Sequence, residues 1–428
     1  MQVEYGKNGI EISPPAGATI LRADHPSDEL SEADVRRSLE SPIASVSLAK
    51  LLRDKKPSSV AITISDITRA VPNRQFLPAI LGCVEEAGVA ADSVVIVIGT
   101  GMHRPSTEEE RRVLVGEAIL QRYNVIDHRA DDPTTLLKMS SDPYVAINRQ
   151  FAEADFRIVT GFIEPHFMAG FSGGRKGVCP ALVDLSTVQR FHGYATLADP
   201  MAREGVLDGN PCHETALGVA ELVGVDFLFN VSVASPGGIA GVYCGDLIEA
   251  HVAGCEDVAA SSGVAIDEPY DIVVTSGGGY PLDQTFYQTV KGLCMALPAV
   301  KPGGALLIAS DCSEQLGSEE YTKLMMDYAG RWRDFLSDIA ANSGRTQKDQ
   351  WEFQMQCRVF EKVRPEEVYL FSDGLSPEMQ EVTGLNPVPG SAPVASRLQQ
   401  TLDRLVREKP DARVAIVPDG PYTMLKPR

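Results

Sequence analysis

The stretch "SVAITISDITRAVPNRQFLPAILGCVEEAGVAADSVVIVIGT", residues 59–100, contains two short apolar runs separated by a longer mixed segment. The runs "SVAITIS" and "SVVIVIGT" are continuous rather than alternating, which is typical of strands that are covered on both faces. The segment "NRQFLPAILGCVEEAG" between them has the character of a helix. A strand, a helix and a second strand in this order favour an α/β fold with a parallel sheet.

Six further apolar runs outside this stretch predict buried strands, with helical segments such as "SRLQQTLDRLVREK" among them. We therefore expect two α/β domains with largely parallel sheets and an active site in the cleft between them. The acidic, proline-containing segment 262–270 suggests a boundary, so that the domains span residues 1–265 and 266–394. The sequence leaves open whether residues 395–428 return to the first domain. The six runs are "FRIVTGF" (156–162), "FLFNVSV" (227–233), "DIVVTSGG" (271–278), "GALLIAS" (304–310), "VYLFSD" (368–373) and "RVAIVPDG" (413–420).

Composition excludes several classes of partner. The 428 residues carry a net charge of −19, which disfavours nucleic acid and anionic membrane surfaces. The mean hydropathy of −0.07 and the lack of a long apolar run argue against a membrane span, and the start "MQVEYGKNGIEIS" has no secretory layout. The eight cysteines include no C-x-x-C pair, so we expect reduced thiols and a cytoplasmic location.

Polar segments follow four of the predicted strands: "SDITRAVPN", "GTGMHRPS", "IEPH" and "SGGGYPLDQ". Ligands in open α/β sheets bind beyond the carboxyl ends of the strands, so these segments predict one assembled site. The glycines in two of them suit either phosphate binding or a tight turn between strand and helix. Neither segment matches G-x-G-x-x-G or the Walker pattern, so the sequence leaves both interpretations open.

A fifth segment, "EPHFMAGFSGGRKGVCPAL" at 164–182, combines a histidine, glycines, a serine and an Arg-Lys pair. Strand and helix interiors avoid glycine, so this loop is better explained as a shaped binding loop. Its Lys176 is either a surface lysine or a covalent attachment point, since a deprotonated amine is a nucleophile. Arg69 suits bidentate carboxylate capture. Three histidines lie beside glycines, prolines or strand ends: His103, His166 and His192. The other four lie in ordinary settings and are interpreted as structural: His25, His128, His213 and His251.

Five motifs in order, "SDITRAVP", "GTGMHRP", "EPHFMAGFSGGRK", "RFHG" and "FYQTVKG", resemble the nickel-dependent lactate racemase family. The similarity extends from about residue 60 to about residue 355. The resemblance implies a cytoplasmic isomerase that racemises or epimerises a 2-hydroxy acid by hydride transfer to a nickel pincer nucleotide. That cofactor, pyridinium-3-thioamide-5-thiocarboxylic acid mononucleotide, requires dedicated synthesis enzymes as maturation partners.

The resemblance also implies roles for individual residues. The first domain would supply the cofactor lysine and the site histidines, and the second would supply most of the substrate contacts. Expected are covalent cofactor attachment at Lys176, nickel binding by His192, and general acid/base roles for His103 and His166. Asp66, Gly173 and Gly174 would adjoin the cofactor, and the substrate would contact Arg69, Tyr287, Gln288, Lys291 and Trp351.

The chain departs from the family pattern after the lysine. It has Pro180-Ala181 where the family usually has Pro-Gly, and Cys179 where an aliphatic residue is expected. The alternatives to a racemase are a nucleotide-binding, oxidoreductase-like protein, an enzyme that handles the cofactor, or an inactive member that only binds hydroxy acids. The sequence identifies neither the particular 2-hydroxy acid nor the oligomeric state.

Overall fold

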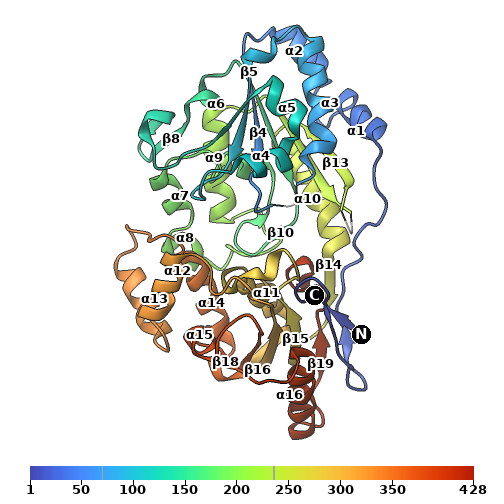
Figure 1. Cartoon of the computed structure of the whole chain (residues 1–428), viewed down its shortest axis with the longest axis vertical. Coiled ribbons are helices and arrows are strands. Elements are labelled where there is room, and N and C mark those ends of the chain that lie inside the picture. Colours follow the sequence, from blue (N-terminus) through green and yellow to red (C-terminus); the bar gives the residue numbers. More distant parts are fainter. Residues whose placement is uncertain (70, 235–236) are drawn as a thin grey trace. The chain divides into compact units, whose positions relative to one another are not determined.

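A computed structural model describes residues 1–69, 71–234 and 237–428. The chain forms two compact units, and each contains one six-stranded sheet (Figure 1). Unit 1 consists of Met1–Asp24, Gly193–Pro200 and Ser262–Arg428, and unit 2 of His25–His192 and Met201–Ser261.

The sheet of unit 2 has the strand order β13-β12-β9-β4-β5-β6. All neighbouring strands are parallel except β13, which is antiparallel to β12 and closes one edge. Its three central strands β9, β4 and β5 therefore end at the same edge of the sheet. The strands are β4 (Val60–Ser65), β5 (Val94–Gly99), β6 (Asn124–Asp127), β9 (Phe156–Phe162), β12 (Phe227–Val233) and β13 (Ile239–Gly245).

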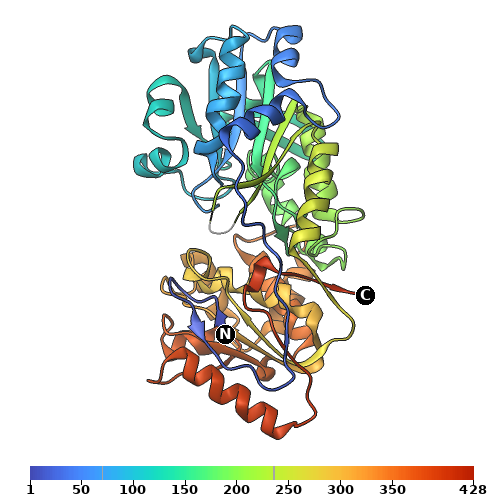
Figure 2. The ribbon, with the colours of Figure 1, turned by 90° about the vertical axis from the view of Figure 1, so that its right-hand side faces the viewer.

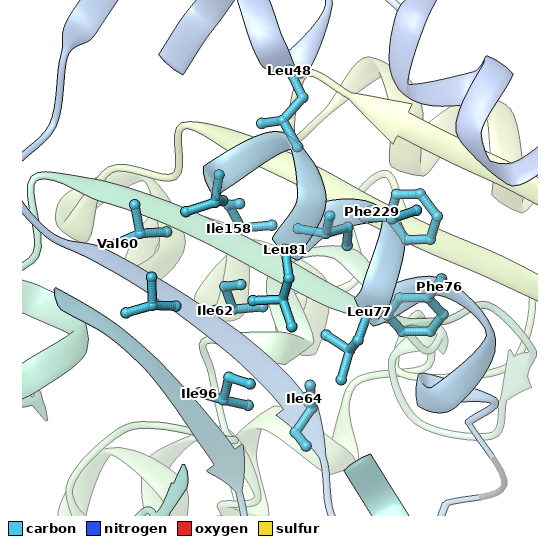
Figure 3. Close-up of a cluster of buried hydrophobic side chains, with 14 of the residues drawn as sticks. Leu48, Val60, Ile62, Ile64, Phe76, Leu77, Leu81, Ile96, Ile158 and Phe229 are labelled. Carbon is cyan, nitrogen blue, oxygen red and sulfur yellow. The ribbon is translucent and has the colours of Figure 1, made fainter. Parts of the chain in front are cut away.

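Helix α3 (Asn73–Glu86) covers part of one face of this sheet with its apolar side chains. Its apolar residues recur at helical spacing on one face, which packs on β4, β5 and β9 (Figure 3). The Phe76 ring lies 5.0 Å from that of Phe229 on β12. The other helices of the unit are α1 (Glu32–Glu40), α2 (Leu48–Lys55), α4 (Glu108–Val115), α5 (Glu117–Arg122), α6 (Arg149–Glu153), α7 (Leu185–Phe191), α9 (Pro211–Val223) and α10 (Glu249–Ser262).

The sheet of unit 1 has the order β18-β17-β16-β15-β19-β3 and is parallel throughout. Figure 2 shows α16 (Val394–Glu408) in this unit, beside the N-terminal residues, and its buried leucines join the core of the sheet. The strands are β3 (Thr19–Ile20), β15 (Tyr270–Ser276), β16 (Val300–Ala309), β17 (Val368–Phe371), β18 (Asn386–Pro387) and β19 (Val414–Ile416). The other helices are α8 (Tyr194–Ala198), α11 (Phe286–Ala296), α12 (Glu319–Asp327), α13 (Trp332–Ala341), α14 (Gln350–Lys362) and α15 (Pro377–Val382).

The α/β class with largely parallel sheets is confirmed, and each predicted strand overlaps an observed one. The sequence left the place of residues 395–428 open, and they lie in unit 1 because β19 is inserted between β15 and β3. Two other segments differ from the expected division of the chain. Residues 1–24 join the same unit through β3. Residues 193–200 join it because Gln354 and Arg358 on α14 donate hydrogen bonds to backbone carbonyls of α8 and its C-cap.

None of the eight cysteines forms a disulfide, and all except Cys83 are buried. Among the described residues, no helix combines the length and the apolar character needed to cross a membrane.

Candidate functional site

The parallel order β9-β4-β5 brings three of the predicted polar loops to one edge of the unit 2 sheet. These loops carry Asp66 and Arg69 after β4, His103 after β5 and His166 after β9. The fourth loop, "SGGGYPLDQ", follows β15 and belongs to unit 1. The predicted site residues therefore form one group in each unit.

Asp66 and His103 form a hydrogen-bonded pair. His103 Nδ1 lies 2.6 Å from Asp66 Oδ2, and Thr68 donates to Asp66 Oδ1 from its hydroxyl at 2.6 Å and its backbone N–H at 3.2 Å. Burial alone would raise the pKa of Asp66, but these hydrogen bonds and the charge of Arg69 outweigh it and lower that pKa. The carboxylate is therefore ionised at neutral pH and holds a proton on His103 Nδ1. The Nε2 atom of neutral His103 then carries the lone pair.

His166 has the opposite arrangement. It lies on the short strand β10 (Pro165–His166), and the backbone N–H groups of Met168 and Ala169 both donate to its Nδ1 at 3.2 Å. A ring nitrogen that accepts hydrogen bonds carries no proton, so neutral His166 has its proton on Nε2. The two histidines thus present complementary groups, a lone pair on His103 Nε2 and an N–H on His166 Nε2.

Lys176 and His192 both lie against Phe191. The Lys176 Nζ atom is 6.0 Å from the centre of the Phe191 ring, and the His192 ring meets it edge-on at 4.6 Å. Burial lowers the pKa of His192 to about 3, and the positive charge of Lys176 contributes. His192 Nδ1 donates to the Val188 carbonyl at 3.0 Å, so the lone pair of this neutral ring is on Nε2. A neutral imidazole of fixed tautomer has the form that ligates metals.

Gly173 and Gly174 permit close packing of the lysine loop. Both have positive φ, +72° and +54°. A Cβ atom at Gly173 would lie 2.6 Å from Asn230 Oδ1, and one at Gly174 would lie 2.5 Å from the His251 ring. The space beside both glycines is therefore filled by protein. Glycine is therefore required at these positions by the backbone conformation and close packing of the loop, rather than by a need for open space beside a ligand.

The departures from the family pattern have local explanations. Burial raises the pKa of Cys179 to about 12, so this thiol stays protonated and acts as a packing residue. Ala181 lies opposite Gly99, where an added Cβ would come within 2.8 Å of the alanine methyl group. The extra methyl group at 181 is thus accommodated by the absence of a side chain at 99.

In unit 1, the predicted substrate residues lie on α11 and α14. Trp351 Nε1 donates to the Tyr287 hydroxyl at 2.8 Å, and Tyr287 packs edge-on against Tyr321 with 5.1 Å between ring centres. Burial and nearby carboxylates raise the pKa of Tyr287 well above its ordinary value, so the phenol stays neutral. The Gln288 Oε1 atom is buried and accepts no hydrogen bond from the described residues. Lys291, one helical turn after Tyr287, is half-buried.

Several residues that hold this site were not predicted to do so. Asn230 accepts a hydrogen bond from Gly174 N at 2.6 Å, and Asn210 donates to the Met168 carbonyl at 2.9 Å. His251, interpreted from sequence as structural, contacts the lysine loop directly. These residues are distant in sequence from the loop, and no motif marks them.

Histidines and a lysine on loops at the carboxyl ends of parallel strands are typical of α/β enzymes. Sequence profiles named lactate racemase N-terminal domain and lactate racemase C-terminal domain match residues 5–205 and 266–424. The chain belongs to the lactate racemase family and is an isomerase.

Two full-length relatives carry the name lactate racemase. That of Thermoanaerobacterium thermosaccharolyticum is 32% identical over 98% of this chain and 97% of its own. That of Lactiplantibacillus plantarum is 34% identical over 96% of this chain and 95% of its own.

Two solved structures are similar to this chain. The lactate racemase apoprotein of T. thermosaccharolyticum superposes with a TM-score of 0.90 at 30% identity, covering 100% of this chain and 99% of that one. A crystal structure of a Thermotoga maritima protein reaches 0.69 at 18% identity, covering 94% of this chain and 100% of that one, and shows the fold alone.

Proposed function

We propose that this isomerase inverts the C2 stereocentre of lactate or a closely similar 2-hydroxy acid. The name shared by both full-length relatives supports lactate as the substrate. The observation that carries the proposal is the pair of histidines with complementary tautomers at one sheet edge. One ring can accept a proton from a substrate hydroxyl while the other donates a hydrogen bond.

The side chains present fit a nickel pincer nucleotide. Among the described residues, no group of three or more His, Cys, Asp or Glu side chains could hold a metal ion. A metal would thus need donors beyond the protein, and His192 Nε2 would be its protein ligand. Lys176, whose charge acts on His192, would carry the cofactor covalently. When bound, the cofactor would supply nickel and a ring able to accept a hydride.

The need for a hydride acceptor follows from the substrate. The Cα proton of a 2-hydroxy acid is weakly acidic beside a carboxylate, so an imidazole is a poor base for it. In the proposed reaction, His103 Nε2 removes the hydroxyl proton of one enantiomer instead, and the hydroxyl of the other enantiomer receives its proton from His166 Nε2. To give up that proton, His166 must start protonated on both ring nitrogens, which requires its Nδ1 to release the Met168 and Ala169 amides. In the reverse direction the two histidines exchange roles.

The other proposed residues bind and orient the substrate. Arg69 and Lys291 are the cations that the family resemblance proposes for the substrate carboxylate, and the planar guanidinium of Arg69 can bind both oxygens. Gln288, whose buried Oε1 accepts no hydrogen bond from the described residues, is proposed as a further contact to the substrate. Trp351 donates a hydrogen bond to the Tyr287 hydroxyl, and both side chains are proposed to contact the substrate.

The test is racemisation in heavy water. Protein produced together with the cofactor-synthesis enzymes and loaded with nickel is given each enantiomer of lactate, and the products are separated by chiral chromatography. We expect interconversion with the original hydrogen retained at Cα, because the hydrogen travels as hydride. Free exchange of that hydrogen with solvent would exclude the hydride route, and no interconversion of any short 2-hydroxy acid would exclude the racemase assignment.

A substitution at Asp66 tests the tautomer argument. In Asp66→Asn the charge that holds the proton on His103 Nδ1 is lost, so we expect kcat to fall about 10- to 100-fold with an altered pH profile. The matched control is Thr68→Val, which removes one hydrogen bond to Asp66 but keeps the carboxylate. Equal losses in the two variants would show that the charge of Asp66 is unimportant.

A further inference from the structure

Arg175, next to the proposed cofactor lysine, is a buried cation without a counter-ion. It is 1% exposed, and burial lowers its pKa only to about 10, so it stays charged at neutral pH. Among the described residues, no carboxylate pairs with its guanidinium. Burying an unpaired charge is costly, so the compensating contacts show what the cation does.

Those contacts are with the lysine loop itself. Arg175 Nη2 donates to the Ala169 carbonyl at 2.7 Å, and Nη1 donates to the Gly173 carbonyl at 3.2 Å. The guanidinium thus bridges two carbonyls that lie four residues apart in the loop. Such a fork of fixed geometry ties the loop to itself in a way that a lysine at 175 could not.

His251 on α10 supports the loop from the other side. Its Nε2 lies 3.0 Å from Arg175 Nη1 and 2.9 Å from the Ser172 carbonyl. Burial and the charge of Arg175 lower the pKa of His251 far below its ordinary value, so the ring is neutral. A neutral ring nitrogen either accepts from Arg175 or donates to Ser172, so either tautomer holds the loop. The ring also fills the space beside Gly174.

We propose that Arg175 and His251 are positioning residues for Lys176, which fix the loop 169–176 and thereby set the place of the lysine amine. This inference rests on the proposed function, because it assigns the purpose of the clamp to cofactor attachment. Neither residue needs to touch substrate or cofactor. The free-energy cost of burying this cation is explained if its role is to hold a reactive side chain in one place.

Two measurements on Arg175→Met test the inference. Hydrogen exchange of the apo protein should show amides in 170–178 exchanging at least about 10-fold faster than in wild type. The fraction of protein carrying the covalent adduct, read by intact mass after production with the synthesis enzymes, should fall at least about 10-fold. The same two measurements apply to His251. The rise in loop exchange and the loss of adduct should be smaller in His251→Gln than in His251→Leu, because the carboxamide keeps a hydrogen-bonding group.

Arg157→Met is the matched control. Arg157 also caps backbone carbonyls in unit 2, those of Phe151 and Ala152, but lies outside the lysine loop. If Arg175 had only a structural role, Arg175→Met would lose thermal stability while the folded protein carried a normal amount of adduct, and that result would overturn the inference. Unchanged loop exchange in Arg175→Met would overturn it too. Absence of the adduct from wild-type protein would instead overturn the proposed cofactor chemistry.

Discussion

Lys176→Ala is expected to give a folded protein with no covalent cofactor and no detectable racemase activity. The side chain is half-buried on the short 3-10 turn Gly174–Gly177, and the hydrogen bonds of that turn come from its backbone, Asn230 and Arg175. Intact-mass measurement after production with the cofactor-synthesis enzymes should show an adduct in wild type that the variant lacks, because only a nucleophilic amine can form the bond.

Two further variants separate the amine from the charge. Lys176→Arg keeps the positive charge that acts on His192 but has no reactive amine, so it should also lack the adduct. Lys138→Ala removes another lysine of unit 2 whose Nζ lies over an aromatic ring, 5.8 Å from the centre of Tyr144. It should load normally. An adduct of wild-type mass on Lys176→Ala would exclude Lys176 as the attachment point.

The sheets were predictable because burial on both faces leaves a strong signal. Continuous runs such as "FRIVTGF" coincide with observed strands, since a central parallel strand must be apolar along its whole length. The edges were not predictable. β13 is antiparallel and only partly buried in its middle, and β3 and β18 have two residues each, so none is buried along a long continuous run. The membership of residues 1–24 and 395–428 in unit 1 depends on pairing between distant strands, which local pattern does not encode.

Contacts between distant segments also limited the prediction of the site. Loops at the ends of adjacent strands could be grouped from sequence, and the structure places Asp66 within 2.6 Å of His103 although they are 37 residues apart. The carboxylate partner itself was not foreseen, because Asp66 was expected to adjoin the cofactor. Asn230 and His251 support the lysine loop from β12 and α10. Their role depends on side-chain packing around Gly173 and Gly174, which becomes visible only when the chain is folded.

Loss of either His103 or His166, the proposed acid/base histidines, should reduce kcat about 100-fold or more. Alanine at 103 removes the lone pair on Nε2, and alanine at 166 removes the Nε2–H group. Each alanine also removes a local contact, to Asp66 or to the amides of Met168 and Ala169. Initial rates from each enantiomer, measured on protein with the same cofactor content by mass, give the values to compare.

Asparagine provides the matched variants, because its amide group can replace the Nδ1 contacts without supplying an Nε2 atom. In His103→Asn the amide N–H can donate to Asp66, and in His166→Asn the amide oxygen can accept from the loop amides. Both should be as slow as the alanine variants although the local contacts are restored. Enantiomers have equal free energy, so kcat/KM must fall equally in the two directions for every variant. Substantial recovery in an asparagine variant would show that the histidine there acts by holding its loop rather than by handling a proton.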